Sequence, residues 1–398
     1  MSIDNDYFIS CEHHRPCPVV EPYMGKHAVK SASFFDTVQK MQDERMPLDW
    51  VYRPLKVEVE LTNGCNESCP HCGMSAQPIS QSTLLRRDFL LSIPYQLKAL
   101  GIPGISITGG EPFTAMPNLL ELLSACRDKV DVVKITTNGY WADSLDAAKA
   151  KLTLLADNGF IESRLFRPVL MLSIGEQRVP LERIVYVIVA AKTLFKSKAL
   201  ALCISSLSLR LGDERISDLE GSYKEITGNT FPWDSVYLTK RSYISAGRAL
   251  LDTRLPKKLI PIEKMCKDRG CFRQTIGAFV VPTPLIKVNG TAYSCSVFGM
   301  PDELVLGNVY NNSIKEIIEA ANNNYYIRIL AEGNLPALRK IVSDTDSLFG
   351  DVAVDNFHEA CWRLIAAHRG QCQININTKK AQQIALPDCN SASIHCRR

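Results

Sequence analysis

The sequence lacks the features that would place the protein in a membrane or on nucleic acid. No apolar run reaches the ~20 residues that a membrane-spanning helix needs, because the longest, near Ile184 to Leu194, is short and is interrupted by Lys192. Its 46 lysines and arginines nearly balance 42 aspartates and glutamates, and the net charge of +4 is too small to indicate a nucleic-acid partner. Internal repeats and low-complexity tracts are absent. We therefore expect a cytoplasmic protein with neither a membrane nor nucleic acid as a partner.

We also expect no secretory signal, because the stretch Met1 to Asp6 carries acid and no apolar core. Fourteen cysteines are nevertheless present. Without a signal, so many cysteines argue against a disulfide framework and for metal ligation in a reducing compartment. The 398 residues, 46% hydrophobic and 22% charged, are ordinary for a globular protein and suffice for two modest domains or one barrel with an extension.

Three of the cysteines, Cys65, Cys69 and Cys72, stand at Cys-x3-Cys-x2-Cys spacing directly after a strand-like run at 56–61. Thiolates are the ligands that iron–sulfur clusters select, and three on one loop can bind three irons of a four-iron cluster. The fourth iron is then left for a small molecule. Zinc is the alternative, but a structural zinc site closes its shell with four ligands, usually from Cys-x2-Cys pairs. His71 lies between two of the cysteines, where it cannot easily reach the same metal.

Two further motifs follow strand-like runs. Gly109-Gly110-Glu111-Pro112 comes directly after the apolar stretch 105–108. Its glycines allow the backbone to approach a ligand closely, and Glu111 offers a carboxylate to an ammonium group. Thr136-Thr137-Asn138-Gly139 follows the stretch 132–135 in the same way.

Together the three motifs resemble those of the radical S-adenosylmethionine (SAM) superfamily. The resemblance implies a [4Fe-4S] cluster on Cys65, Cys69 and Cys72, with SAM on the open iron. In this family the aromatic slot, here His71, lies near the adenine, and the Gly-Gly-Glu-Pro motif holds the amino group of SAM. The residues that the resemblance assigns to the cofactor are therefore His71, Gly109, Gly110, Glu111, Thr137 and Asn138.

Other candidates each have a second, structural interpretation. Ser173, like Glu176, stands where relatives often contact the SAM ribose, but it can equally be a strand-end cap. Arg248 lies in a Gly-Arg-Ala stretch that resembles a family signature; its guanidinium suits the SAM carboxylate or a structural salt bridge. Glu58 and Glu60 alternate with apolar residues, so one face of their strand is acidic. They can meet a cationic substrate group or, in the interpretation that we favour, pair with an internal base.

Strand-like and helix-like segments alternate from residue 54 to about 247. Six alternations imply an α/β fold with a parallel sheet and right-handed crossovers, and the resemblance implies a partial (β/α)6 barrel. In α/β barrels the loops at the strand C-termini carry the site, which is where all three motifs fall. We expect an N-terminal extension at 1–50, the barrel at 51–250 and a second domain at 251–398. Strands are expected at 55–61, 104–108, 132–136, 168–174, 199–209 and 235–240, and helices at 118–129, 144–158, 180–196 and 213–228.

The region 251–398 carries further cysteines. Residues 285–295 predict a hairpin, because Asn-Gly at 289–290 favours a type I′ turn, and a helix is expected at 313–321. This arrangement resembles the SPASM and twitch extensions, α+β units that bind an auxiliary [4Fe-4S] cluster. The full SPASM run Cys-x2-Cys-x5-Cys-x3-Cys is absent, which favours the single-cluster twitch form. The implied ligands are Cys266, Cys271 and Cys295, with Cys361 or Cys372 as the fourth; buried structural cysteines are the alternative.

The remaining cysteines have simpler interpretations. Cys11 and Cys17 can be ligands or part of a lid, but we favour free thiols because no second ligand pair accompanies them. Cys126 and Cys203 fall on helix and strand patterns and are expected in the core. Two more, at 389 and 396, lie in a polar tail and are expected to be unliganded.

The resemblance implies reductive cleavage of SAM to a 5′-deoxyadenosyl radical, which abstracts a substrate hydrogen, with an electron from a reductant such as flavodoxin or ferredoxin. Three functions follow. We favour an oxidoreductase-like peptide maturase that cross-links, epimerises or oxidises a ribosomally made peptide, because such enzymes often have cysteine-rich C-terminal extensions. A dehydrogenase or other enzyme acting on a small molecule in natural-product biosynthesis is the second. A non-catalytic electron carrier is the third, and it would not need Gly109-Gly110-Glu111-Pro112.

Overall fold

The computed structural model describes most of the region 43–240 and separate parts of the C-terminal region. The described residues are 40, 43–161, 167–174, 179–195, 201–206, 211–233, 235–240, 260–261, 273–275, 278–280, 283–295, 300–342, 353–354 and 357–381. Within them, none of the helices combines the length and the apolar character that a bilayer crossing requires.

The centre of the fold is a row of six parallel strands whose spatial order follows the chain. Each of the first five strands is followed by a crossover to its parallel neighbour, and within the described residues no further strand pairs with β8. The predicted partial (β/α)6 barrel is therefore confirmed. The strands are β1 (Lys56–Thr62), β4 (Gly104–Gly109), β5 (Val132–Thr137), β6 (Arg167–Ser173), β7 (Ala201–Ser206) and β8 (Val236–Lys240).

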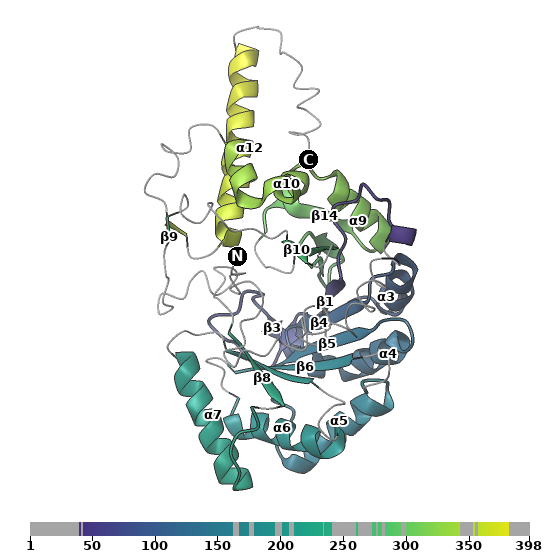
Figure 1. Cartoon of the computed structure of the whole chain (residues 1–398), viewed down its shortest axis with the longest axis vertical. Helices are drawn as coiled ribbons and strands as arrows, with labels where there is room; N and C mark the ends of the chain where they lie inside the picture. The colour runs from purple at the N-terminus through teal and green to yellow at the C-terminus, as the bar shows by residue number, and fades with distance from the viewer. Residues whose placement is uncertain are drawn as a thin grey trace.

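Five crossover helices form an arc outside this row (Figure 1). The four helices expected from the sequence are present, and a further one, α3, follows the cysteine motif. It carries Pro94 within it, and its apolar face, which includes Leu90 and Leu97, is nevertheless buried. The bounds are α3 (Arg87–Leu100), α4 (Met116–Cys126), α5 (Leu145–Asp157), α6 (Leu181–Phe195) and α7 (Leu211–Thr227).

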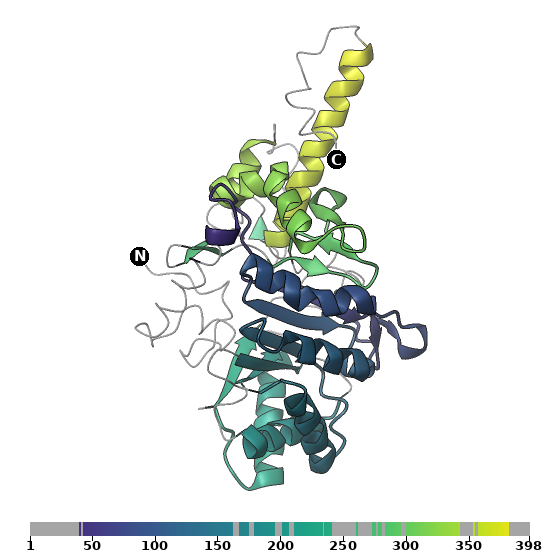
Figure 2. The same ribbon diagram turned by 90° about the vertical axis from the view of Figure 1, so that its right-hand side faces the viewer.

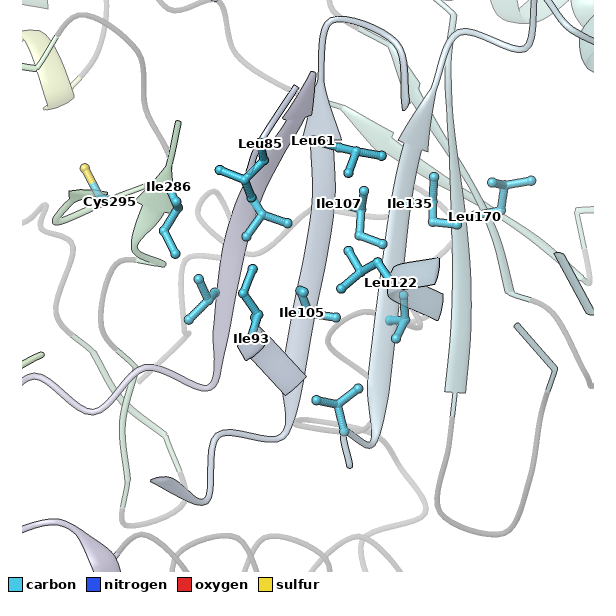
Figure 3. Packing of buried hydrophobic residues seen from close by; sticks show 14 of the residues in the cluster. Leu61, Leu85, Ile93, Ile105, Ile107, Leu122, Ile135, Leu170, Ile286 and Cys295 are labelled. Atoms are coloured by element: carbon cyan, nitrogen blue, oxygen red, sulfur yellow. The ribbon is translucent and has the colours of Figure 1, made fainter. Parts of the chain in front are cut away.

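The two faces of the sheet differ because successive side chains of a strand point to opposite sides. Leu61, Ile107 and Ile135 lie side by side on the face that the helices cover (Figure 3). The other face carries polar residues. There Glu58 and Lys134 flank Ser106 across three neighbouring strands, and Lys134 Nζ lies 3.9 Å from Glu58 Oε2. The prediction that the acidic face of the first strand pairs with an internal base is confirmed for Glu58.

The C-terminal hairpin continues the same sheet. Strand β12 (Leu285–Ile286) runs parallel to β1, and β13 (Thr291–Tyr293) and β14 (Val305–Asn308) follow it antiparallel. The carboxylate of Glu60 strengthens this junction by accepting a 3.0 Å hydrogen bond from Val288 N. The region beyond the barrel therefore shares a sheet with it.

The predicted hairpin is present, but the predicted type I′ turn is wrong. A type I′ turn needs positive φ at both Asn289 and Gly290, and only Gly290 has it, at 83°. Gly290 N donates to Lys287 O, and Lys287 N donates to Thr291 O. This pattern is a three-residue loop with glycine in the left-handed position, a conformation that Asn-Gly supports as readily.

Three helices complete the described C-terminal part, and α12 extends away from the barrel (Figure 2). Ser313 and Glu316 form a capping box at the start of α9, which confirms the helix expected there. The helices are α9 (Ile314–Asn323), α10 (Tyr325–Lys340) and α12 (Phe357–Ala381). Short elements are β2 (Gly64–Cys65), β3 (Gln77–Pro78), β9 (Ile260–Pro261), β10 (Arg273–Thr275), β11 (Ala278–Val280), β15 (Ala353–Val354) and the 3-10 turns Ile79–Gln81, Pro112–Ala115 and Asp302–Leu304.

Candidate functional site

The cysteine motif forms a closed loop at the C-terminal end of β1. Its ends are held together by the short parallel pair β2–β3, in which Cys65 is opposite Pro78. Within the loop, Cys72 N donates to Cys69 O at 3.2 Å, which turns the chain between the second and third cysteine. All three thiols are half-buried, so they are shielded from bulk water and still accessible to a bound group.

The environment of the thiols suits a cationic centre. The pKa of the Cys65 thiol is raised to about 12, mainly by burial and also by the nearby Glu111, Cys69 and Cys72, while the hydrogen bond from Glu67 N acts in the opposite direction. A thiolate is the metal-binding form of cysteine. Loss of the protons from these three thiols therefore becomes favourable only when a positively charged centre lies among them.

The donor set fits a four-iron cluster. Among the described side chains, no three His, Cys, Asp or Glu residues are arranged around a single metal ion. A cluster does not require that arrangement, because each thiolate binds a different iron.

The glycine motif packs directly against the chain that leads into the cysteine loop. Gly110 N donates to Thr62 O at 2.7 Å, and Glu111 N donates to Gly64 O at 2.8 Å. A Cβ atom added at Gly109 or Gly110 would overlap the carbonyl oxygen of Thr62 or Gly64, respectively. Because they lack side chains, the two glycines therefore pack closely against the backbone of the protein itself.

Glu111 has its carboxylate turned into the protein, with the residue only 1% exposed. Its oxygens accept hydrogen bonds from Thr137 Oγ1 at 2.7 Å, Asn138 N at 2.8 Å and Phe113 N at 3.1 Å. These occupy three of the roughly four acceptor positions of a carboxylate, so one is left for a ligand N–H group. Burial raises the pKa of Glu111 to about 7, and the three donors only partly offset it.

The third motif completes the junction. The Thr137 hydroxyl, besides donating to Glu111, accepts from Gly139 N and Trp141 Nε1. The indole of Trp141 stacks on the ring of Phe113 with centroids 4.2 Å apart, so the loops after β4 and β5 also share an aromatic contact. The buried Thr137 side chain is thus committed to the scaffold.

Asn138 reaches the cysteine loop itself. Its Nδ2 lies 2.9 Å from Asn66 Oδ1 and 3.9 Å from Cys65 Sγ. Hydrogen bonds therefore connect all three sequence motifs at one edge of the sheet. No sequence pattern pointed to the contact with Asn66, because the two residues belong to different motifs.

The other candidates stand apart from this junction or outside the described residues. His71 is half-buried on the turn between Cys69 and Cys72. Ser173 is half-buried at the end of β6, opposite Ser205 of β7. The candidates outside the described residues are Arg248, Glu176, Cys266, Cys271, Cys11, Cys17 and the two cysteines of the tail.

The side chains of two of the cysteines expected at an auxiliary cluster are described, and both are buried. Cys295 follows β13, beside the hairpin residue Ile286 (Figure 3), and its Sγ lies 3.1 Å from Met300 Sδ. Cys361 lies on α12, the helix that also contains Cys372. Cys126 is buried at the end of α4, as expected of a core residue.

Comparison with known families agrees with this geometry. A sequence model of the Radical SAM superfamily matches residues 59–192, a range that contains all three motifs. Residues 59–192 are therefore similar to a radical SAM domain, and the α/β fold with a mostly parallel central sheet matches that of radical SAM enzymes.

Curated relatives match short segments of the chain. The peptide biosynthesis protein YydG of Bacillus subtilis is 31% identical over 86 residues, which are 21% of this chain and 27% of the relative. A protein of Saccharolobus solfataricus named GTP 3′,8-cyclase is 33% identical over 107 residues, 26% of this chain and 34% of the relative. The chain thus spans about a quarter to a third of the relatives' length.

Solved structures show a distant similarity. BtrN in complex with AdoMet and 2-DOIA aligns with 70% of this chain and 88% of its own, at 16% identity and a TM-score of 0.38. Streptococcus suis SuiB bound to its precursor peptide SuiA aligns with 77% of this chain and 78% of its own, at 13% identity and a TM-score of 0.36.

Proposed function

We propose that the protein is a radical SAM enzyme whose catalytic centre is the junction of the three motifs. The observation that supports this most is the chain of hydrogen bonds from Glu111 through Asn138 to the loop of Cys65. An electron carrier needs a cluster, but it does not need a carboxylate buried beside that cluster with an acceptor position to spare.

The residues of the site have distinct roles in this proposal. Cys65, Cys69 and Cys72 hold the cluster, and Glu111 with the backbone of Gly109 and Gly110 receives the amino group of SAM. Held by these cysteines, the cluster would supply the one electron that reductively cleaves SAM, and the 5′-deoxyadenosyl radical released would take a hydrogen atom from the substrate. In this proposal the protein binds and orients SAM and the substrate and keeps water away from that radical. The proposed SAM site is completed by His71 near the adenine, Ser173 near the ribose and Arg248. Thr137 and Asn138 belong to it because they hold the carboxylate of Glu111 in place.

For the substrate we propose a ribosomally made peptide that is cross-linked, epimerised or oxidised. The match to YydG, a protein named for peptide biosynthesis, supports this choice. The cysteines of the C-terminal region support it by analogy, because an auxiliary cluster on Cys266, Cys271, Cys295 and Cys361 can accept the electron left on an oxidised substrate. A reductant such as flavodoxin or ferredoxin, and a cytoplasmic location, suit iron–sulfur chemistry.

The alternative is an enzyme acting on a small molecule. The match to GTP 3′,8-cyclase favours it, because that relative is named for a reaction on a nucleotide. The two candidates differ in the source of the hydrogen atom that enters 5′-deoxyadenosine.

The proposal is tested with anaerobically reconstituted protein, SAM and dithionite. We expect 5′-deoxyadenosine to form, and formation to be lost in Cys69→Ala and in Glu111→Ala, whereas Cys126→Ala, a change to a core cysteine, retains it. Deuterated peptides and deuterated small molecules then identify the substrate by the label found in 5′-deoxyadenosine. A reconstituted cluster that never cleaves SAM would leave only the electron carrier, and full turnover by Glu111→Ala would refute the role given to that carboxylate.

A further inference from the structure

The side chain of Asn138 has a fixed orientation. Its Oδ1 accepts a 3.0 Å hydrogen bond from Tyr140 N. A backbone N–H can only donate, so the oxygen of the amide must face Tyr140 and the NH2 group must face the other way. The backbone N of Asn138 is bound separately, to Glu111 Oε2.

The NH2 group faces the first cysteine of the loop. One N–H lies 2.9 Å from Asn66 Oδ1, and Nδ2 is 3.9 Å from Cys65 Sγ. Asn138 is only 7% exposed, so little water competes for these donors. Cys65 Sγ also accepts from Glu67 N at 3.3 Å, so its sulfur receives two N–H donors from two different segments.

We propose that Asn138 is a positioning residue for the cluster: its carboxamide holds Cys65 and raises the reduction potential of the cluster. The inference rests on the proposed function, in which Cys65 is a cluster ligand. It assigns the side chain of Asn138 to the metal centre and not to SAM. Hydrogen bonds to the ligand sulfurs are among the factors that set cluster potentials. A donor beside the thiolate stabilises the reduced state more, because that state carries more negative charge.

The contact can be removed without disturbing the junction as a whole. Asn138→Asp keeps an oxygen for Tyr140 N and the backbone bond to Glu111, but it replaces the N–H donor facing Cys65 with an acceptor. Asn138→Ala removes the whole carboxamide. Asn158→Asp is the matched control, since it makes the same chemical change at a half-buried, hydrogen-bonded asparagine after α5, at the opposite edge of the sheet.

The test is a redox titration of the cluster followed by electron paramagnetic resonance, with the cluster content measured as iron and sulfide. For comparison between variants, Cys266, Cys271 and Cys295 are changed to alanine, so that one signal is titrated. At a fixed potential we expect the ratio of reduced to oxidised cluster to fall roughly tenfold in Asn138→Asp, which is about 59 mV for a one-electron couple. In Asn138→Ala the reduction potential of the cluster should shift in the same direction by a smaller amount. In Asn158→Asp the potential should equal that of the parent protein.

The outcomes separate the inference from the proposed function. Loss of iron from Asn138→Asp in a chain that unfolds at the same temperature as the control supports the inference, because holding Cys65 is part of the role. Full iron content with an unchanged or higher potential in both Asn138 variants would overturn it, while SAM cleavage would still support the proposed function. A parent protein that binds no cluster on Cys65 would overturn both.

Discussion

The Thr137 hydroxyl donates a 2.7 Å hydrogen bond to Oε1 of the buried Glu111. Through this contact the loop after β5 is tied to the loop after β4, and Glu111 N in turn donates to Gly64 O beside the first cysteine. The three motifs are therefore one hydrogen-bonded unit at the C-terminal edge of the sheet. A substitution in any one motif should therefore alter the conformation of the other two.

The buried Glu111 should make the stability of the cofactor-free protein depend on pH. Its pKa is raised from 4.5 to about 7 when the protein folds, so between these values the folded state binds the proton more tightly. The free energy of unfolding should fall by about 3 kcal/mol as the pH rises through this window, at 1.36 kcal/mol per pKa unit, and level off above it. Urea unfolding of wild type and Glu111→Gln from pH 4.5 to 8 measures this as the difference between their slopes.

The control for this measurement is Glu121→Gln, at a surface carboxylate whose pKa is lowered by Arg87. It should keep the falling slope of the wild type. Equal slopes in wild type and Glu111→Gln would show that the carboxyl group of Glu111 is not protonated more readily in the folded protein.

Gly110→Ala should disrupt the site through its backbone. The added Cβ would overlap Gly64 O, which cannot move without displacing the start of the cysteine loop. We expect a loss of about 1 to 3 kcal/mol in unfolding free energy and poor iron retention after reconstitution. Gly221→Ala, at a helical glycine with open space around it, is the matched control and should be neutral or stabilising by up to about 1 kcal/mol. Equal iron content in the two variants would contradict the tight fit at Gly110.

Lys134→Met should destabilise the barrel strongly. Lys134 is paired with Glu58, and the two side chains are only 5% and 13% exposed. Removing the ammonium leaves a buried carboxylate without its counter-charge, which typically costs about 3 to 5 kcal/mol. Lys315→Met removes an exposed partner of Glu319, and such helical pairs contribute only about 0.3 to 0.5 kcal/mol. Thermal or urea unfolding that ranks the two variants equally would refute the structural role of the Glu58–Lys134 pair.

Iron and sulfide counts test the auxiliary cluster. We expect two four-iron clusters per reconstituted chain, and one after Cys266, Cys271 and Cys295 are changed to alanine together. Cys126→Ala, at a core cysteine of α4, should leave the count unchanged. A single cluster in the wild-type protein would show that no auxiliary cluster is bound. The buried Cys295 and Cys361 would then be core residues.

Much of the barrel could be predicted because its signals are local. Strand-like runs such as Val132–Thr137 are apolar and bounded by polar loops, and the alternation of Glu58 with Val57 and Val59 already marks two faces. The turn at Asn289-Gly290 was harder, because the same two residues suit both a two-residue type I′ loop and a three-residue loop, and only the first needs a positive φ at Asn289. The pairing of β12 with β1 could not be predicted from the sequence, because a two-residue strand is too short to show a periodic pattern.

By itself the sequence determined where the three motifs lie: three cysteines at fixed spacing after one strand, and two further motifs after the next two. Those features depend on spacing along the chain and on which face a side chain occupies, and both can be read locally. Only the tertiary structure decided that Gly110 packs on Gly64, that Glu111 is held by Thr137 and Asn138, and that Asn138 reaches Cys65. These contacts join residues far apart in the chain, and they form because parallel pairing brings the ends of β1, β4 and β5 to one edge in a particular register.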